Sequence, residues 1–581
     1  MKQTRIRKGA AFGIIAVMVS AMLLASMPTV SAKLYGDANG DGKIDMRDVT
    51  YVGLIILGKK PANELADANQ DGRVNVGDIT YIELVILGEA PFPGGDITVV
   101  CTREFKGLHP TGFSGSWGAP NVLVYEPLAD FENDYREKVP VLAESWEMSS
   151  DGKQWTFHLR RGVKFHDGTD FDSDDVKFTF EWKLEHDRTW IQGLERIECP
   201  DEYTVKFFFD RPRFILSSDF ATPQCGIMSS TTPLDEDGNV KKAIGTGPFK
   251  VADYSKQQVI LERNNEYWGK KAKLEKITMR VIPDANTHIM ALEAGEVDII
   301  PCIEAFASVP MLEANPDLKV SGKLSVGTFI LYMNTKREPF TDVRVRKAIN
   351  YAIDKESITE TILEGTCKPA KYMFSPVFEK FIDEDAVPYE YDPTKAEELL
   401  ADAGWVDTDG DGYLDKKGKP FEVTLTFQTG SLDFPMVVEA LQYQLGELGI
   451  LVTLNPVEPA LRSELQKSGD FDFLFTWQSY IPHDDPSLYY EGYYHSERGR
   501  YHFLEDPEID ALIDELESTG DTQKRLELHY ALQREIMDRA PAVFLYHRGD
   551  YMAMKKCIKD FEVTIGSWML YKQLTKAYSA C

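Results

Sequence analysis

Two copies of an acidic twelve-residue loop constrain the fold of this 581-residue chain more than any other feature of its sequence. The first copy begins at Asp37 and the second at Asp67, and a short apolar segment closed by Leu-Gly follows each. Oxygen atoms at loop positions 1, 3, 5, 9 and 12, with a carbonyl at position 7, suit a hard cation such as Ca²⁺. Glycine at position 6 (Gly42 and Gly72) permits the sharp turn. Because the loop is repeated, we predict two calcium-binding loop–helix units rather than solvated turns.

The predicted ligands correspond position by position in the two copies. For the first ion they are Asp37, Asn39, Asp41, Lys43 through its carbonyl, Asp45 and Asp48. For the second they are Asp67, Asn69, Asp71, Arg73 through its carbonyl, Asn75 and Asp78. Residues 37–90 closely resemble a dockerin module, which implies a small all-α calcium-binding domain with a cohesin partner. The residues that this resemblance assigns to partner binding are Met46, Arg47, Val76 and Gly77.

The N-terminus has the three parts of a secretory signal peptide. Basic residues come first, an apolar stretch covers residues 10–25, and small residues end at Ala32. Cleavage there would start the mature chain at Lys33. An uncleaved membrane anchor is the alternative, because residues 10–30 are nearly long enough to span a bilayer. We therefore expect an exported protein that is extracellular, associated with the cell surface or periplasmic.

Composition and missing motifs exclude several classes of function. The formal charge of −29 argues against a nucleic-acid partner, which needs a basic footprint. The sequence contains no P-loop, no HExxH zinc motif and no GxSxG nucleophile elbow, so we expect no enzyme. The seven cysteines form no CxxC pair, and their disulfide pairing stays open.

After about residue 96, short β-rich runs alternate with helical patterns, which favours an α/β architecture in more than one lobe. Strands are expected at residues 97–101 and 204–209, and helices at 343–354, 394–403 and 436–448.

Five sequence blocks in this region stand in a fixed order. They are Leu142–Trp146, Gly162–Gly168, Gly245–Phe249, Asn265–Gly269 and Pro339–Ala348. Together they resemble the family 5 extracellular solute-binding proteins, the peptide, nickel and oligosaccharide receptors of ABC importers. The resemblance implies a two-lobed periplasmic-binding-protein-like fold of type II that closes on its ligand.

The resulting domain prediction covers the whole chain. It places a signal peptide at 1–32, the dockerin at 33–91, a linker at 92–95, lobe I at 96–332 with the tail 541–581, and lobe II at 333–540. The expected function is to bind a peptide or peptide-like oligomer and deliver it to a membrane permease, with the dockerin as the tether. An oligosaccharide receptor of the same family is the first alternative, and a dockerin-borne hydrolase or a scaffold component is the alternative of another class.

The predicted solute-binding residues follow from the same resemblance. Peptide-binding members usually carry Trp-x-x-Asp after the strand that here ends near Trp477, and the Asp pairs with the peptide ammonium. Tyr480 stands in place of that Asp, so recognition falls either to Asp484 in the longer loop or to sugar stacking on aromatic rings. The complete predicted set is Trp477, Tyr480, Asp484, Tyr332, Asn334 and Trp117. Core packing alone is the alternative role for Trp477.

A second acidic loop lies in the predicted lobe II. Asp407, Asp409, Asp411 and Asp415 repeat loop positions 1, 3, 5 and 9, but Gly418 occupies position 12. A calcium-stabilised hairpin and a plain turn built on Asp side chains are both compatible with this incomplete match. We therefore expect two calcium ions in the dockerin, with a third in lobe II as an open alternative.

Overall fold

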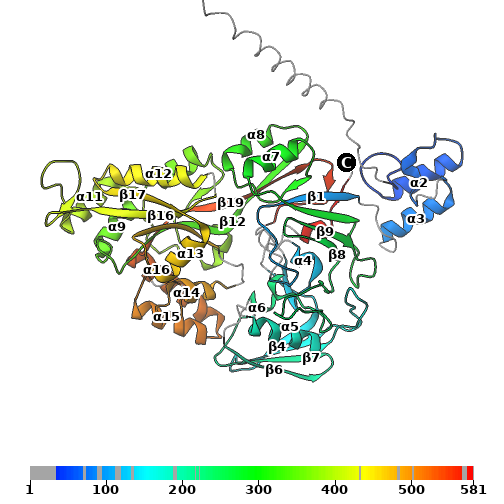
Figure 1. Ribbon diagram of the computed structural model, residues 1–581, viewed down its shortest axis with the longest axis horizontal. Helices are drawn as coiled ribbons and strands as arrows, with labels where there is room; N and C mark the ends of the chain where they lie inside the picture. Colours follow the sequence, from blue (N-terminus) through cyan, green and yellow to red (C-terminus); the bar gives the residue numbers. More distant parts are fainter. Residues whose placement is uncertain are drawn as a thin grey trace, which may run out of the picture. The chain divides into compact units, whose positions relative to one another are not determined.

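The chain forms two compact units, one made of the residues up to Gly95 with Ser579–Cys581 and the other of Asp96–Tyr578 (Figure 1). The computed structural model describes residues 35–69, 73–87, 95–111, 120–132, 137–186, 193–215, 218–221, 223–430, 433–479, 485–499, 501, 503–564 and 572–579. The predicted signal peptide and most of the predicted linker lie outside these residues. Among the described helices, none is both long and apolar enough to span a membrane.

The N-terminal unit is a small helical domain. Its elements are α2 (Met46–Ile56), the short 3₁₀ helix η1 (Glu64–Ala66) and α3 (Val76–Leu87). Asp45 and Asp48 cap α2 reciprocally. The Asp45 side chain accepts the backbone N–H of Asp48, and the Asp48 side chain accepts the backbone N–H of Asp45. Val52 and Ile82 are fully buried and belong to the domain's small apolar core. The sequence prediction of a small all-α domain is confirmed.

The large unit is built on an eleven-stranded mixed sheet, counted over the described residues. In spatial order its strands are β17 (Leu451–Val457), β16 (Glu422–Gln428), β18 (Phe473–Ser479), β12 (Leu318–Met333), β19 (Ala542–Lys555), β11 (Ile299–Ile300), β1 (Asp96–Cys101), β10 (Lys276–Val281), β9 (Gln258–Arg263) and β8 (Phe249–Tyr254), with β13 (Lys368–Pro369) paired to β19. The expected strand at 97–101 is confirmed as β1. The two-lobed α/β fold class predicted from the sequence is likewise confirmed.

A separate four-stranded antiparallel sheet packs against helix α5 (Ser173–Glu185). Its order is β4 (Ala143–Met148), β5 (Gln154–Leu159), β7 (Thr204–Phe209) and β6 (Leu194–Asp201), which confirms the strand expected at 204–209. Phe157, Phe180 and Phe207 meet in its core. The remaining short strand pairs are β2 (Ala129–Glu132) with β3 (Glu137–Pro140), β14 (Asp415–Lys416) with β15 (Lys419–Pro420), and β20 (Ile558–Lys559) with β21 (Tyr578–Ser579).

Helices cover the sheets and confirm the helical patterns in the sequence. The three expected helices appear as α9 (Val343–Ala352), α11 (Pro393–Asp402) and α12 (Asp433–Gly446). The others are α4 (Asn121–Val124), α6 (Ser218–Ala221), α7 (Ala285–Glu293), α8 (Val309–Glu313), α10 (Lys355–Ser357), α13 (Pro459–Ser468), α14 (Ser487–Tyr494), α15 (Pro507–Ser518) and α16 (Thr522–Arg539). Short turns of other helix types are η2 (Pro223–Cys225), η3 (Phe306–Ser308), η4 (Ile358–Ile362), η5 (Pro376–Phe381) and η6 (Gln573–Thr575).

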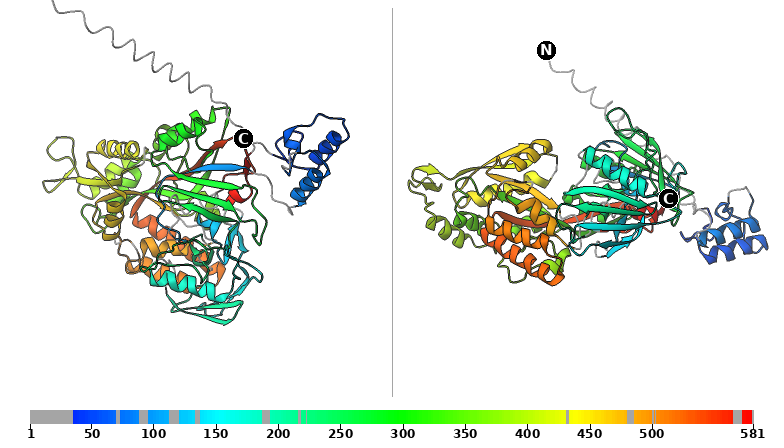
Figure 2. Two further views of the ribbon diagram at one scale, coloured as in Figure 1. Left: turned by 45° about the vertical axis from the view of Figure 1, so that its right-hand side comes forward. Right: turned by 90° about the horizontal axis from the view of Figure 1, so that it is seen from below.

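Strand β16 lies between two parallel strands, β17 on one side and β18 on the other. The chain passes from β16 through α12 to β17, and then through α13 back across to β18. Helices α12 and α13 consequently cover opposite faces of the sheet (Figures 1 and 2). In open α/β sheets such a reversal leaves a crevice at the carboxyl ends of the strands, where ligands bind.

A buried charged cluster holds α14 against α16. The Asp485 carboxylate accepts hydrogen bonds from Arg525 Nε at 2.9 Å and pairs with His529 Nε2 at 3.0 Å. Burial alone would raise the pKa of Asp485, but the contacts with His529 and Arg525 outweigh it and hold the pKa well below its usual range. The Arg525 guanidinium also donates to the carbonyl oxygens of Leu516 and Thr519 at the end of α15.

Asp485→Asn should therefore destabilise the large unit by about 3 kcal/mol at pH 7, because it leaves a buried guanidinium without its counter-charge. The folded-state pKa lies below the ordinary value of 3.8, so this stabilisation is complete above that pH and disappears as the pH falls below it. Urea unfolding of both proteins between pH 7 and pH 3 measures the difference. Glu439→Gln, an exposed change on α12, is the control. An equal loss in the control, or a difference that grows in acid, would contradict the account.

Candidate functional site

The first calcium loop is preformed around the Asp37 side chain. Asp37 is 4% exposed, and its two carboxylate oxygens accept the backbone N–H groups of Asp41 at 3.0 Å and Gly42 at 2.8 Å. Asp48, fully buried at position 12, accepts the N–H groups of Asn39 and Asp45. Burial, followed by the neighbouring carboxylates, raises the pKa of Asp37 and of Asp48. A divalent cation fits this donor set, since it would offset both the burial and the mutual repulsion.

The second loop repeats the same backbone contacts. Asp78 is fully buried and accepts the N–H groups of Asn69 at 3.2 Å and Asn75 at 2.7 Å. Asp67 is half-buried and Arg73 is exposed. Asp71 and the glycine after it lie outside the described residues. The repeated pattern places the two loops in equivalent roles at the starts of α2 and α3.

The residues predicted to bind a partner lie at the same two helix starts. Met46 is 56% exposed and Val76 is 63% exposed. The Arg47 guanidinium pairs with Asp41 at 2.7 Å and with Asp45 at 2.6 Å, so in this structure it covers two of the predicted calcium ligands. Gly77 is half-buried, and its N–H donates to Asn75 Oδ1. The two surfaces therefore differ, because only the first carries this arginine.

Calcium should control the folding of the N-terminal unit, because a pair of short helices buries too little apolar surface to fold alone. Circular dichroism of the isolated segment 33–91 should show helix with calcium and its loss with a chelator. In Asp37→Ala the calcium concentration at the midpoint of folding should rise about tenfold or more, because the substitution removes the ligand at loop position 1. Glu83→Ala, which removes an exposed acid on α3, should behave as wild type. Helicity that is unchanged by the chelator would contradict this prediction.

A cavity of about 180 Å³ lies where the strands of the large sheet end. On one side its walls follow the carboxyl ends of β1, β10 and β11, and on the other those of β16 and β18. The lining residues are Thr102, Arg103, Pro283, Glu304, Phe306, Phe329, Gln428, Thr429, Gly430, Phe434, Pro459, Trp477 and Arg548. Apolar walls with a few convergent polar groups are typical of a ligand site.

Trp477 is one of the predicted residues that the structure places in this cavity. It lies near the end of β18, paired in register with Phe329 of β12. Its ring centre is 6.3 Å from that of Phe329 and 6.4 Å from that of Phe434. Trp477 is only half-buried, so one part of the ring packs on the core while the rest borders the cavity.

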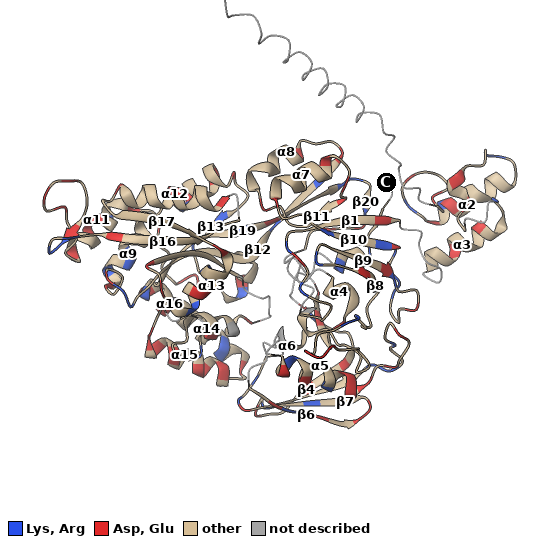
Figure 3. Cartoon of the chain, in the orientation of Figure 1, with Lys and Arg blue, Asp and Glu red and all other residues tan. Residues whose placement is uncertain are grey.

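Charged groups gather at the Arg548 side of the cavity. The guanidinium lies 2.8 Å from Cys302 Sγ and 3.4 Å from Asp550. Burial acts against its charge, but Cys302, Asp550 and Glu304 together raise the pKa of Arg548. Asp433, 3% exposed, accepts the N–H of Phe306, and burial raises its pKa to about 6. Elsewhere acidic residues are spread over outer elements such as α11 and α15 (Figure 3).

Two predicted solute-binding residues lie away from this cavity, and their assignment is corrected. Tyr332 pairs with Leu474, on the opposite sheet face from Trp477, and packs on Phe503 with ring centres 4.4 Å apart. Successive residues of a strand point to alternate faces of the sheet. Tyr332 lies three positions along the strand from Phe329, the partner of Trp477, and so points to the other face. Asn334 is 2% exposed and uses its amide to bind the carbonyl oxygens of Gly469 and Phe471. The structure therefore places neither Tyr332 nor Asn334 in the wall of this cavity.

The other three predicted solute-binding residues, Trp117, Tyr480 and Asp484, lie outside the described residues. Sequence reasoning also missed most of the cavity wall, above all Arg103, Phe306, Phe434 and Arg548. The available signal was positional: Arg103 and Phe306 follow the buried strands β1 and β11 within a few residues. Polar or aromatic residues just beyond a parallel strand are the expected site positions in such a sheet.

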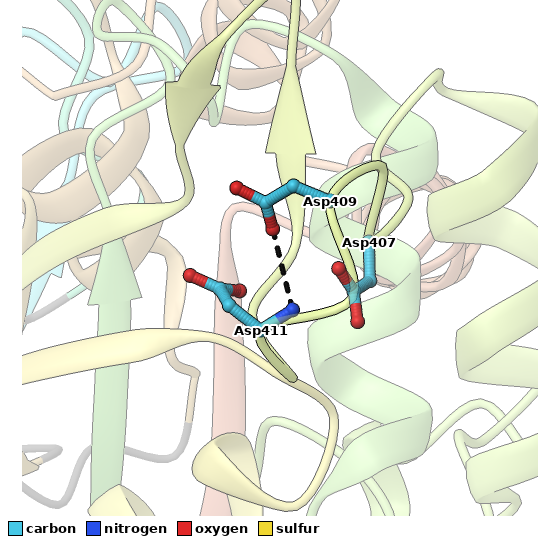
Figure 4. A group of neighbouring side chains, drawn as sticks. All are labelled: Asp407, Asp409 and Asp411. Atoms are coloured by element: carbon cyan, nitrogen blue, oxygen red, sulfur yellow. Dashed lines mark hydrogen bonds between the residues drawn. The ribbon is translucent and has the colours of Figure 1, made fainter.

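The acidic loop of the middle region gathers three of its four predicted ligands. Asp407, Asp409 and Asp411 each offer a carboxylate oxygen, and these oxygens lie within 4.8 Å of one another (Figure 4). All three side chains are exposed. Asp415 is instead bound by the N–H and hydroxyl of Thr408, which lower its pKa.

Comparison with known proteins gives the same architecture. The model for bacterial extracellular solute-binding proteins, family 5 middle, matches residues 137–500. The chain belongs to this family. A dockerin type I domain matches residues 35–87. Because the family consists of transport receptors without catalytic activity, the solute-binding protein is not an enzyme.

Two curated relatives and one solved structure show how far the similarity extends. The oligopeptide-binding protein AppA of Bacillus subtilis (strain 168) is 30% identical, over 81% of this chain and 90% of its own. The nickel-binding periplasmic protein of Escherichia coli (strain K12) is also 30% identical, over 79% of this chain and 89% of its own. The structure of AppA from Bacillus subtilis with a nonapeptide has a TM-score of 0.70 at 28% identity and covers 84% of this chain and 99% of that one.

Proposed function

We propose that this solute-binding protein captures a peptide or peptide-like oligomer outside the cell and delivers it to an ABC permease. The observation that carries the proposal is the cavity between the strand ends of β1, β10 and β11 and those of β16 and β18. The proposed lobes are 96–332 with the tail from 541, and 333–540. A ligand that touches both lobes binds their closed arrangement better than the open one, and so favours closure by that difference in affinity.

The charges of the cavity favour a peptide over an oligosaccharide. Glu304 and Asp433 form an acidic region that a single guanidinium, Arg548, offsets, while Arg103 lines the same cavity. A zwitterionic chain offers charges of both signs to these groups, whereas a neutral sugar offers neither. One relative is named an oligopeptide-binding protein and was solved with a nonapeptide, which agrees with this choice.

Trp477→Ala should weaken solute binding by about 1–2 kcal/mol, roughly tenfold, because the ring forms part of the cavity wall. Trp477→Phe keeps an aromatic face and should lose much less. Native mass spectrometry of each protein with one mixture of short peptides and neutral oligosaccharides measures which solutes are bound. Capture of oligosaccharides alone would refute the peptide proposal. An alanine variant that unfolds more easily but binds as wild type would make Trp477 a core residue.

The proposed role of the dockerin is to tether the receptor near its permease through a cohesin. The exposed residues Met46 and Val76 at the helix starts, together with Arg47, are the proposed contact surface. A flexible tether holds a protein at an effective concentration of about the millimolar range, far above that of freely diffusing receptor. Two calcium ions are proposed for the dockerin. Calcium stoichiometry by mass spectrometry distinguishes a third ion at Asp407, Asp409 and Asp411 from a plain turn.

Calcium chelation should release the mature receptor from intact cells, because the metal holds the partner-binding helices in place. A magnesium-buffered wash of equal ionic strength serves as the control. The released protein is identified by its N-terminus and should begin near Lys33. Retention of a chain that still begins at Met1 would show that the N-terminal apolar segment is the anchor instead.

A further inference from the structure

A short segment that follows β7, residues 211–215, connects the two proposed lobes. It is anchored to the four-stranded sheet, because the Arg213 N–H donates to the Gly152 carbonyl at 2.7 Å and Trp155 Nε1 donates to the Arg213 carbonyl at 2.8 Å. Its other side contacts α14 and the turn between α15 and α16. In Figure 1 these helices and the four-stranded sheet lie below the main sheet, away from the β12–β19 pair. The contact therefore joins the proposed lobes far from the strands that connect them.

An ion pair crosses this contact. The Arg211 guanidinium lies 3.1 Å from Glu491 of α14, a side chain whose residue is only 3% exposed. Arg498 contacts Glu491 and also Glu517 of α15, each at 3.2 Å. Burial, followed by the charge of Glu491, raises the pKa of Glu517 to about 7, while Arg498 and Arg211 act in the opposite direction. Without Arg211, Arg498 would have to offset both carboxylates, although it already pairs with Asp514 as well.

The Phe214 ring fits between two glycines, one from each proposed lobe. A methyl group at Gly152, in the turn between β4 and β5, would lie 2.9 Å from the ring. One at Gly520, in the turn between α15 and α16, would lie 2.8 Å from it on the other proposed lobe. Both distances are shorter than a van der Waals contact between carbon atoms. The close packing of this ring on lobe II therefore depends on glycine at position 520.

The space that remains between the 211–215 segment and the helices is too small for a solute. A cavity of about 30 Å³ lies there, between this segment and the residues Ser487, Glu517 and Arg525. Pockets that hold small-molecule ligands measure about 300 Å³ or more, whereas this volume holds about one water molecule. The two surfaces therefore pack on each other and do not enclose a second ligand.

We propose that the 211–215 segment and helices α14 to α16 form a latch that stabilises the closed arrangement of the two proposed lobes. A rotation about β12 and β19 separates Arg211 from Glu491 and the Phe214 ring from Gly520. None of these latch residues lines the solute cavity. The latch therefore favours closure by the same free energy whichever solute is bound, in addition to the solute's own preference for the closed arrangement. This inference rests on the two proposed lobes but not on the identity of the solute.

Small-angle X-ray scattering of the full-length protein in calcium, without added solute, tests the latch. Arg211→Gln removes the ion pair. Gly520→Ala puts a methyl group against the Phe214 ring, and alanine itself fits the backbone there because the φ angle of Gly520 is not in the left-handed region. Both variants should have a larger radius of gyration than wild type, with a fitted ratio of closed to open molecules that is lower by about fivefold or more. Arg196→Gln, which removes an exposed arginine of β6 in the same four-stranded sheet, is the control.

An equal radius of gyration in wild type and both variants would overturn the latch. Arg211→Lys keeps the positive charge and should stay closer to wild type than Arg211→Gln does, and equal opening in these two would overturn the role of the ion pair. Circular dichroism checks that each variant is folded. Should Gly520→Ala fail to fold, the two Arg211 variants decide the result. Because no solute is added, failure of the latch leaves peptide capture standing, and failure of peptide capture leaves the latch standing.

Discussion

The pairing of β12 with β19 is the contact on which the rest of the large unit depends. These strands, of 16 and 14 residues, lie in the middle of the main sheet and connect the strands of its two halves. Their register shifts between Leu324 and Thr328 and again next to Phe329. Such an irregularity bends a strand and redirects its side chains. It lies where Phe329 and Arg548 reach the cavity, so the junction of the two halves also forms part of the proposed binding site.

The same geometry would couple ligand binding to the proposed closure of the two lobes. The cavity wall takes residues from strand ends on both sides of the β12–β19 pair, so a solute bound at the proposed site would contact both halves at once. A rotation about the central strands changes every one of these contacts together, while the cores of the two halves stay packed. The difference in affinity between the two arrangements is the only free energy that a solute can contribute to closure.

The calcium loops could be predicted from the sequence because their interactions are local. Asp45 and Asp48, three positions apart, both cap α2 and close the loop. The cavity could not be predicted, because Arg103 and Arg548 reach it from opposite ends of the large unit's sequence. The assignment of Tyr332 failed for another reason. Alternate residues of β12 point to opposite sheet faces, and the pattern of one buried strand does not reveal which face borders a ligand.

Both proposed binding sites hold groups of like charge close together. In the dockerin, burial and the neighbouring Asp37 raise the pKa of Asp48, and beside the cavity burial and Glu304 raise the pKa of Asp433. Like charges held close together cost free energy, and this cost disappears when a counter-ion binds between them. This repulsion therefore lowers the stability of the folded dockerin and of the closed receptor until the ligand binds. Folding of the dockerin and closure of the receptor consequently both report that a ligand is bound.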